Sequence, residues 1–229
     1  MELNGKAVLL ARPSAVSNLH IEPAAESSLK DPRMADEFTA DEIRALLDLE
    51  PNATCGFVRI TYLSKRSIAP GGLPAPFADA RPMGSALYFM VTPSAPVRLH
   101  RIRNDQLYHY YLGDPLELFL LPEDGRSERI VVGPDLRGGE QVQVLIPGNT
   151  FHTARVMGRR RWFLGASTEW PGVVPADVEM GDLEALAAKY PPVAADLRAI
   201  AALGPALTGN RVYRSGLAIL PACSTIHAR

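Results

Sequence analysis

Residues 99–121 read LHRIRNDQLYHYYLGDPLELFLL, a stretch in which aromatic and aliphatic segments alternate with turn residues. Segments of the same kind recur on both sides of it, at 56–63 (GFVRITYL), 85–92 (SALYFMVT), 129–133 (RIVVG), 141–147 (QVQVLIP) and 160–168 (RRWFLGAST). Each is short, rich in β-branched or aromatic residues and bounded by turn residues, which is typical of strands. Because no helical segment separates them, the pattern predicts an all-β sandwich or barrel and not an alternating α/β sheet.

Helical signals occur only at the two ends of this strand region. Thr39 is a suitable N-cap, Glu42 follows three residues later, and Pro51 ends the segment, so we expect a helix near 40–49. After the strands, helical periodicity returns at 182–190 (DLEALAAKY) and 194–203 (AADLRAIAAL). We expect these C-terminal helices to pack outside the strands.

These patterns divide the chain into three parts. Residues 38–203 are predicted to form one domain, with its strands over roughly 51–180. Residues 1–37 are an N-terminal extension with no sustained period, and residues 204–229 are a C-terminal extension in which GLAIL could add a strand.

The composition excludes several classes of function. The formal net charge is −1, so the chain lacks the basic excess of a protein that binds nucleic-acid phosphates. The basic run 159–161 leads directly into Trp162 and predicts a hairpin tip. No apolar run approaches the ~20 residues that span a bilayer, so we expect no membrane partner. With two cysteines and no signal-peptide pattern in MELNGKAVLLARPS, we expect a cytoplasmic protein.

The histidines of residues 99–121 and 145–152 lie at the spacing of the two cupin motifs, His-x-His-x3-Glu-x6-Gly and Pro-x-Gly-x2-His-x3-Asn. Aligned from the first histidine, this chain carries His100, Ile102, Gln106, Gly113, Pro147, Asn149, His152 and Val156. All spacings are kept, but only four of the eight residue types are. The chain therefore resembles a cupin in which two motif positions have lost their metal-binding side chains.

More narrowly, the chain resembles the cupin-5 family, a domain of unknown function. The resemblance rests on SALYFMVTPSAPVRLHRIRNDQLYHYYLGDPLELFLL, VVGPDLRGGEQVQVLIPGNTF, FLGASTEWPG and LEALAAKYP. It implies a cupin jelly-roll β-barrel, commonly a homodimer. Family members usually carry glutamate where Gln106 stands and glutamine where His152 stands, so the resemblance implies a pocket of altered charge.

Three interpretations of His100, Gln106 and His152 stay open. They could hold a divalent metal (Fe, Ni or Zn), although two imidazoles and a neutral amide are a weak donor set for one. They could perform metal-free acid/base chemistry, with His100 or His152 as base and Tyr108 as proton donor. They could also only form hydrogen bonds within the fold.

Strand parity assigns each neighbouring side chain to the inner or the outer face. If Gln106 faces the interior, Tyr108 and Tyr110 do so too, whereas His109 and Tyr111 face out. We expect a flat, mostly apolar pocket whose substrate-binding residues are Gln106, Tyr88, Tyr110, Trp162 and Arg59. Weaker candidates are Arg98 for an anionic group and Glu169 and Asp177 for the rim, while Phe89 and Phe119 are expected in the core.

The leading functional hypothesis is an isomerase, epimerase or cyclase that acts by proton transfer on a cyclic or polyketide-like secondary metabolite. The alternatives are a metal-dependent dioxygenase or other oxidoreductase in the same pocket, and a non-catalytic protein that binds a small molecule. We also expect a homodimer, because 115–121 (PLELFLL) has apolar residues on both faces. The competing cover for its outer face is residues 1–35 or 204–229.

Overall fold

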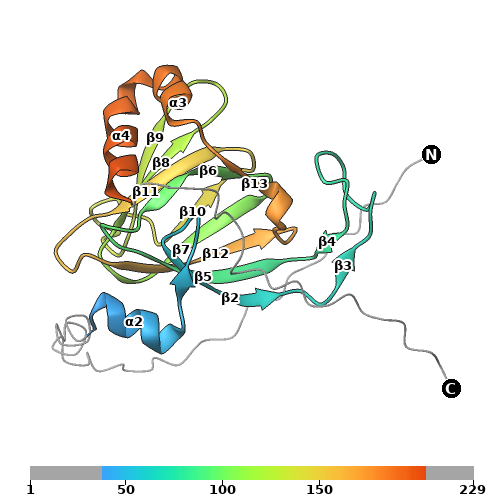
Figure 1. Cartoon of the computed structure of the whole chain (residues 1–229), viewed down its shortest axis with the longest axis horizontal. Helices are drawn as coiled ribbons and strands as arrows, with labels where there is room; N and C mark the ends of the chain where they lie inside the picture. The colour runs from blue at the N-terminus through green and yellow to red at the C-terminus, as the bar shows by residue number, and fades with distance from the viewer. Residues whose placement is uncertain (1–37, 205–229) are drawn as a thin grey trace, which may run out of the picture. The chain divides into compact units, whose positions relative to one another are not determined.

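The computed structural model describes residues 38–204, in which two antiparallel sheets pack face to face (Figure 1). The first sheet has the order β1 (Glu50–Pro51), β2 (Phe57–Leu63), β5 (Ser85–Val91), β12 (Phe163–Trp170), β7 (Asp105–Gly113), β10 (Gln143–Ile146). The second has the order β13 (Val178–Met180), β6 (Val97–Ile102), β11 (Phe151–Val156), β8 (Leu116–Leu121), β9 (Glu128–Val132). A short ladder pairs β3 (Ser67–Ile68) with β4 (Arg81–Pro82).

The predicted all-β jelly roll is confirmed, with one correction to its geometry. Among the described strands no continuous ladder runs from one main sheet into the other, so the fold is a two-sheet sandwich and not a closed barrel. Cys55 and Val97 form an isolated antiparallel bridge at one edge of the sandwich.

Alternation along the strands gives each sheet an inner and an outer face. On β8, Leu116, Leu118 and Leu120 face the opposite sheet, and Phe119 and Leu121 face away from it. The inner side chains of both sheets meet in one buried group, here the interior cluster, which includes Phe89, Val91, Tyr108, Leu116, Leu118, Leu120, Val144, Ala154 and Phe163. This packing fixes the register, because a slip of one residue would turn the inner side chains outward.

Helix α2 (Ala40–Leu47) begins where the sequence predicts it. The Thr39 hydroxyl accepts a hydrogen bond from the Glu42 N–H at 3.2 Å, and the Glu42 carboxylate accepts one from the Thr39 N–H at 2.7 Å. This capping box satisfies N–H groups that have no partner inside the helix. Ile43 of α2 packs with Met90 and Trp162 in a second buried group, the outer cluster, on the outside of the six-stranded sheet.

The C-terminal helices α3 (Leu183–Lys189) and α4 (Ala194–Leu203), joined by the short helix η2 (Pro191–Val193), cover the outer face of the five-stranded sheet (Figure 1). Leu186 and Leu197 pack on Phe119 and Leu121 there. The Tyr190 hydroxyl anchors the helix pair by donating to the backbone oxygens of Leu121 and Pro122, at 3.2 and 2.6 Å. The C-terminal helices therefore pack outside the strands as expected, and they, rather than a second copy or the extensions, cover the outer apolar face of β8.

Strands β6 and β11 were not singled out by the strand pattern. Both are central in the five-stranded sheet and carry His100 and His152. The expected extension 1–37, and all of the expected extension 204–229 except Gly204, lie outside the described residues. Within 38–204, none of the helices has the length and hydropathy that crossing a membrane requires.

Candidate functional site

His100 and His152 lie side by side on neighbouring strands. They are direct partners in the antiparallel register of β6 and β11, and their ring centroids are 4.3 Å apart. On its other side His152 pairs with Leu120 of β8, whose side chain belongs to the interior cluster. Partners across a ladder point to the same face of a sheet, so the two imidazoles face the interior of the sandwich, where both are buried.

Each imidazole is held by the backbone of its own strand in the same way. His100 Nδ1 lies 2.7 Å from the carbonyl oxygen of Arg98, and His152 Nδ1 lies 3.3 Å from that of Thr150. A carbonyl oxygen only accepts hydrogen bonds, so each Nδ1 carries the proton in the neutral ring. The Nε2 atom of each ring is then unprotonated and has a lone pair for a proton or another donor.

Burial keeps both rings neutral at physiological pH. Desolvation lowers the pKa of His100 from 6.5 to about 4, although its bond to Arg98 partly opposes the shift. Desolvation also lowers the pKa of His152 well below 6.5, and the neighbouring His100 lowers it further. The pair therefore consists of two neutral imidazoles that can accept protons.

Tyr108 links the facing sheet to this pair. Its hydroxyl lies 3.2 Å from His152 Nε2 and donates to it, since that nitrogen is unprotonated. The Cys55 thiol lies 3.9 Å from the same hydroxyl. Burial raises the pKa of Tyr108 well above 10, so the phenol keeps its proton and can serve as a donor.

Glu169 supplies a buried carboxyl group on the inner face of the six-stranded sheet. It lies two residues after Ser167, the register partner of Tyr108. Glu169 of β12 is the register partner of Gln106 on β7 and of Ser85 on β5, so all three face the interior. The Glu169 carboxylate accepts hydrogen bonds from the hydroxyls of Ser85, at 2.6 Å, and Ser167. Burial raises the pKa of Glu169, and both serine contacts oppose that shift.

Glu169 is more central than the sequence analysis expected, which placed it only at the rim. Strand alternation counted from Phe163 could have predicted that Glu169 faces the interior. Phe163, Ser167 and Glu169 are an even number of residues apart and share one face of β12. Cys55 lies between β1 and β2, outside both strands, and had no such signal.

The parity prediction for β7 is confirmed. Gln106 and Tyr108 are buried inside, and Tyr110 packs against the interior cluster with its hydroxyl donating to the Gly113 oxygen at 2.9 Å. His109 lies on the outer face, where its ring nitrogens contact Thr168 at 3.0 Å and Gln143 at 3.1 Å.

Three expected pocket residues do not face the interior, and their predicted position is wrong. Phe89 takes the inward position on β5, so its neighbour Tyr88 faces out and packs against the outer cluster, to which Trp162 belongs. Arg59 is exposed and donates to the Leu47 carbonyl oxygen at 3.3 Å. The aromatic wall on the inside is thus smaller than expected.

Asp177, expected at the rim, is wholly buried in an ion pair with Arg81. Asp177 Oδ2 lies 2.9 Å from Arg81 Nη1, and both side chains are at most 1% exposed. This pair ties helix η1 (Pro175–Asp177) to β4. Arg98, a weaker candidate for binding an anionic group, supplies the backbone oxygen that orients His100.

The residues present do not fit a tightly held divalent metal. Gln106 is neutral, and the Nε2 atom of His152 already accepts the Tyr108 proton. Across 38–204 no three His, Cys, Asp or Glu side chains lie close enough together to hold a metal ion. A dioxygenase centre would need a carboxylate beside the two imidazoles, and Glu169 is held by two serines instead.

Comparison with known proteins gives a family profile and two similar structures. The profile described as Cupin superfamily (DUF985) matches residues 41–181. A hypothetical protein from Leishmania major is 26% identical, with a TM-score of 0.62 over 70% of this chain and 97% of that chain. A crystal structure from Shewanella oneidensis has the same identity and TM-score, over 71% of this chain and 97% of that chain.

More distant structures share less of the fold. Oxalate decarboxylase from Bacillus subtilis is 14% identical, with a TM-score of 0.41 over 62% of this chain and 34% of that chain. No curated protein matches.

Proposed function

The chain belongs to the cupin superfamily, in the family described as Cupin superfamily (DUF985), and from that premise we propose that it is a proton-transfer enzyme of the isomerase, epimerase or cyclase kind. The observation that carries the proposal is the pair of neutral imidazoles, His100 and His152, whose Nε2 atoms face a closed interior next to a phenol. Neutral imidazole is a general base, and a buried phenol is a general acid. Both are present in one cluster.

In the proposed mechanism His100 is the base. Within the described part of the chain its Nε2 atom makes no hydrogen bond, so its lone pair is available to a carbon-bound proton of the substrate. Tyr108 is the acid: it gives its proton to the developing oxyanion to form the enol, and takes it back when the carbonyl re-forms and the protonated His100 returns a proton to carbon. The hydrogen bond to His152 Nε2 orients the Tyr108 hydroxyl. Gln106 and Glu169 hold polar groups of the substrate.

The proposed substrate is a small cyclic or polyketide-like metabolite with an acidic C–H beside a carbonyl group. Flat rings line the interior next to the site: the Phe89 ring lies 4.7 Å from that of Tyr108 and 5.4 Å from that of Phe163. Flat apolar walls with a few polar groups suit such a ligand.

Access to this interior requires movement, because Tyr108 and His152 are 0% exposed. The segment that follows β12 folds across the polar end of the sandwich. There Val173 N–H donates to the Ser85 hydroxyl at 3.2 Å, and the Asn104 amide donates to the Pro171 oxygen at 2.6 Å. We infer that this segment opens to admit the substrate.

Solvent-deuterium incorporation tests the proposal without knowledge of the natural product. Full-length protein is incubated in D2O with a panel of cyclic 1,3-dicarbonyl and hydroxyketone compounds, and deuterium in the recovered compounds is measured by mass spectrometry. We expect catalysed exchange with part of the panel. Replacing the base in His100→Gln should slow it about 100-fold or more.

His109→Gln is the matched control, because His109 is on the outer face and should leave exchange unchanged. Equal exchange in His100→Gln and the unaltered protein would contradict the proposed base. Stoichiometric iron, nickel or zinc that is lost in His100→Gln would favour the metal-dependent oxygenase. Ligand binding with no exchange would favour the non-catalytic binder, the alternative that the burial of the cluster supports.

A further inference from the structure

Residues 171–174, here called the lid, close the polar end of the sandwich without apolar anchors. They follow β12 and lead into helix η1 and β13. None of residues 171–176 belongs to a buried apolar cluster. A segment without buried apolar packing opens at a lower free-energy cost than one that packs in a core. The hydrogen bonds of the lid therefore decide how tightly it closes.

Among the described residues, three hydrogen bonds join the lid to β4, β5 and the turn between β6 and β7. They run from the Asn104 amide to the Pro171 oxygen at 2.6 Å, from the Gly172 N–H to the Pro82 oxygen at 2.8 Å and from the Val173 N–H to the Ser85 hydroxyl at 3.2 Å. Two of the three partners, Asn104 and Ser85, contribute side chains. Each of these two bonds can therefore be removed by one substitution that leaves every backbone hydrogen bond of the sheets in place.

The base of the lid is held much more firmly, at Asp177. The Asp177 carboxylate forms the buried ion pair with Arg81 at 2.9 Å and also accepts the Val174 N–H at 2.9 Å. The Asp177 backbone oxygen accepts the Arg103 N–H at 3.2 Å. Directly after it, β13 pairs with β6 over all three of its residues. The lid can thus leave its place while Asp177 stays in its own.

Asn104 carries an unsatisfied acceptor while the lid is closed. Its side chain is buried, and its amide N–H₂ group must face the Pro171 oxygen, which only accepts. Its Oδ1 atom is left without a hydrogen-bond partner in the described part of the chain. A buried acceptor without a donor is unfavourable, and an open lid would let solvent reach it. This cost brings the free energy of the closed lid nearer to that of the open lid.

Ser85 connects the lid to the carboxyl group of the histidine site. Its hydroxyl donates to Glu169 Oε2 at 2.6 Å and accepts from the Val173 N–H. A hydroxyl has a single proton, and here Glu169 receives it, so Ser85 meets the lid only as an acceptor. Opening of the lid therefore begins next to Glu169, a residue that the proposed function assigns to substrate binding.

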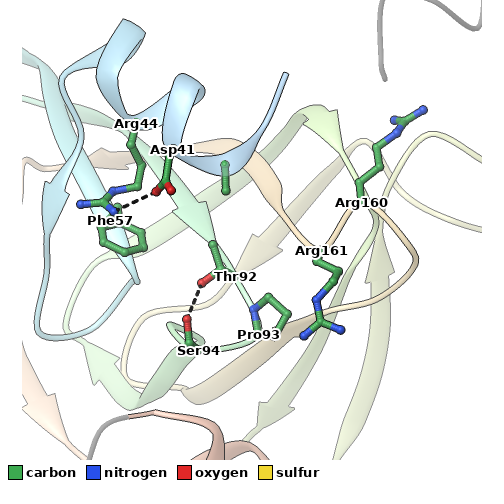
Figure 2. Close-up of a pocket in the computed structure, with 9 residues that line it drawn as sticks. Asp41, Arg44, Phe57, Thr92, Pro93, Ser94, Arg160 and Arg161 are labelled. Atoms are coloured by element: carbon green, nitrogen blue, oxygen red, sulfur yellow. Dashed lines mark hydrogen bonds and ion pairs between the residues drawn. The ribbon is translucent and has the colours of Figure 1, made fainter. Parts of the chain in front are cut away.

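The opposite end of β5 is closed in a different way. A cavity of about 320 Å³ there is bordered by the first turn of α2, the turn after β5 and the loop before β12, and it shares no residue with the histidine site (Figure 2). Arg44 of α2 lies against Phe57 and Asp41 beside this cavity (Figure 2). Ile43 anchors α2 in the outer cluster, so opening this end would break apolar packing.

The loop before β12 contains the basic run 159–161, which the sequence analysis predicted to be a hairpin tip. That prediction is wrong, because the loop crosses from β11 in the five-stranded sheet to β12 in the six-stranded sheet. The Arg161 N–H donates to the Asp114 carboxylate at 2.7 Å, which fixes the loop. Of the two ends of the sandwich, the polar end therefore has the more weakly held cover.

We propose that residues 171–174 form a lid that pivots on Asp177, with the side chains of Asn104 and Ser85 as its two latches. Opening breaks the three hydrogen bonds of the lid together. It leaves the Arg81–Asp177 ion pair and the pairing of β13 with β6 intact. The identity of what enters rests on the proposed function, whereas the motion of the lid does not.

Amide hydrogen exchange in the full-length protein without ligand, measured by NMR, tests this proposal. After correction for intrinsic rates, we expect the Gly172 amide to be protected at least about 10-fold less than the Arg103 amide, which bonds the base. In Ser85→Ala and in Asn104→Ala, exchange at Gly172 should become about 5-fold faster, although its own bond to Pro82 is untouched. Protection of Arg103 should not change, and it also shows that the variants fold.

Ser167→Ala is the matched control. Ser167 donates to the other oxygen of Glu169 and forms no hydrogen bond with the lid, so exchange at Gly172 should stay as it is. Acceleration there equal to that in Ser85→Ala would assign the effect to Glu169 and overturn the Ser85 latch.

The remaining outcomes concern the pivot and the latches. Equal protection of Gly172 and Arg103 would overturn the pivot, because the whole segment would then open as one. Unchanged exchange at Gly172 in both Ser85→Ala and Asn104→Ala would overturn the latches. No substrate takes part in these measurements, so they separate a failure of the lid from a failure of the proposed enzyme, which the deuterium-incorporation test reports.

Discussion

For each histidine of the interior pair, one backbone carbonyl two residues earlier in the strand fixes the tautomer of the ring. Arg98 and Thr150 supply those oxygens, so neighbouring antiparallel strands fix the two rings in the same tautomer. A strand places alternate side chains on one face, and the carbonyl of residue i−2 lies within reach of the ring. The chemistry at Nε2 is therefore set by local strand geometry.

The burial of His100 predicts a pH-dependent stability. Its pKa is about 4 in the folded protein against 6.5 in the unfolded chain, so between these values only the unfolded chain binds the proton. The contribution to stability is therefore present above pH 6.5 and is lost as pH falls toward 4. From pH 7.5 to pH 5 this single group should lower the free energy of unfolding by about 2 kcal/mol.

Urea unfolding at pH 7.5 and pH 5 measures this effect. In His100→Gln the difference between the free energies of unfolding at the two pH values should shrink by about that amount. His152 still contributes its own part of the pH dependence. His109→Gln should change it less, because that ring is only partly buried. An unchanged difference in His100→Gln would show that the imidazole is protonated in the folded protein.

At the scale of elements, sequence pattern predicted what depends on local rules. The capping box at Thr39 and the parity of Gln106, Tyr108 and His109 follow from spacing alone. Strands β6 and β11 were not singled out because VRLHRI and FHTARV mix charged, polar and apolar residues, and their burial comes from neighbours that are distant in sequence.

Tyr88 and Trp162 show where sequence reasoning reached its limit. Aromatic residues suit either face of a strand when both faces are covered, and α2 covers the outer face at these positions. The choice of face was fixed by Phe89, whose ring contacts Tyr108 and Phe163. Only the packing of the two sheets decides such cases. Glu169, in contrast, was within reach of a parity argument from Phe163.

At the scale of the whole molecule, a homodimer stays a prediction, but the surface that would form its interface is no longer the outer face of β8. The outer face of β8 is covered by α3 and α4, so it no longer requires a partner. Exposed apolar side chains remain on the outer face of β7 and β10, where Tyr111 is 46% exposed and Leu145 is 52% exposed. Apolar surface of this kind is often covered by a second copy.

Light scattering at micromolar concentration measures the oligomeric state. We expect a dimer mass for the full-length protein and a monomer mass for Leu145→Glu, because a buried charge at this position opposes association. Leu136→Glu is the control, since Leu136 is also exposed, at 64%, but lies in the loop between β9 and β10. A monomer mass for the unaltered protein would contradict the dimer.

Across the molecule, the interior carries polar groups at one end and aliphatic packing at the other. His100, His152, Gln106 and Glu169 lie near the ends of β6 and β12 and the starts of β7 and β11, on the side where the segment after β12 closes over them. At this polar end two neutral imidazoles with unprotonated Nε2 atoms face each other.

Nitrogen NMR of protein labelled with 15N-histidine measures the protonation state of both rings, with His100→Gln and His152→Gln to assign the signals. We expect both rings to carry their proton on Nδ1, and neither signal to titrate between pH 8 and pH 5.5. A ring with its proton on Nε2, or a ring that titrates near pH 6.5, would contradict it.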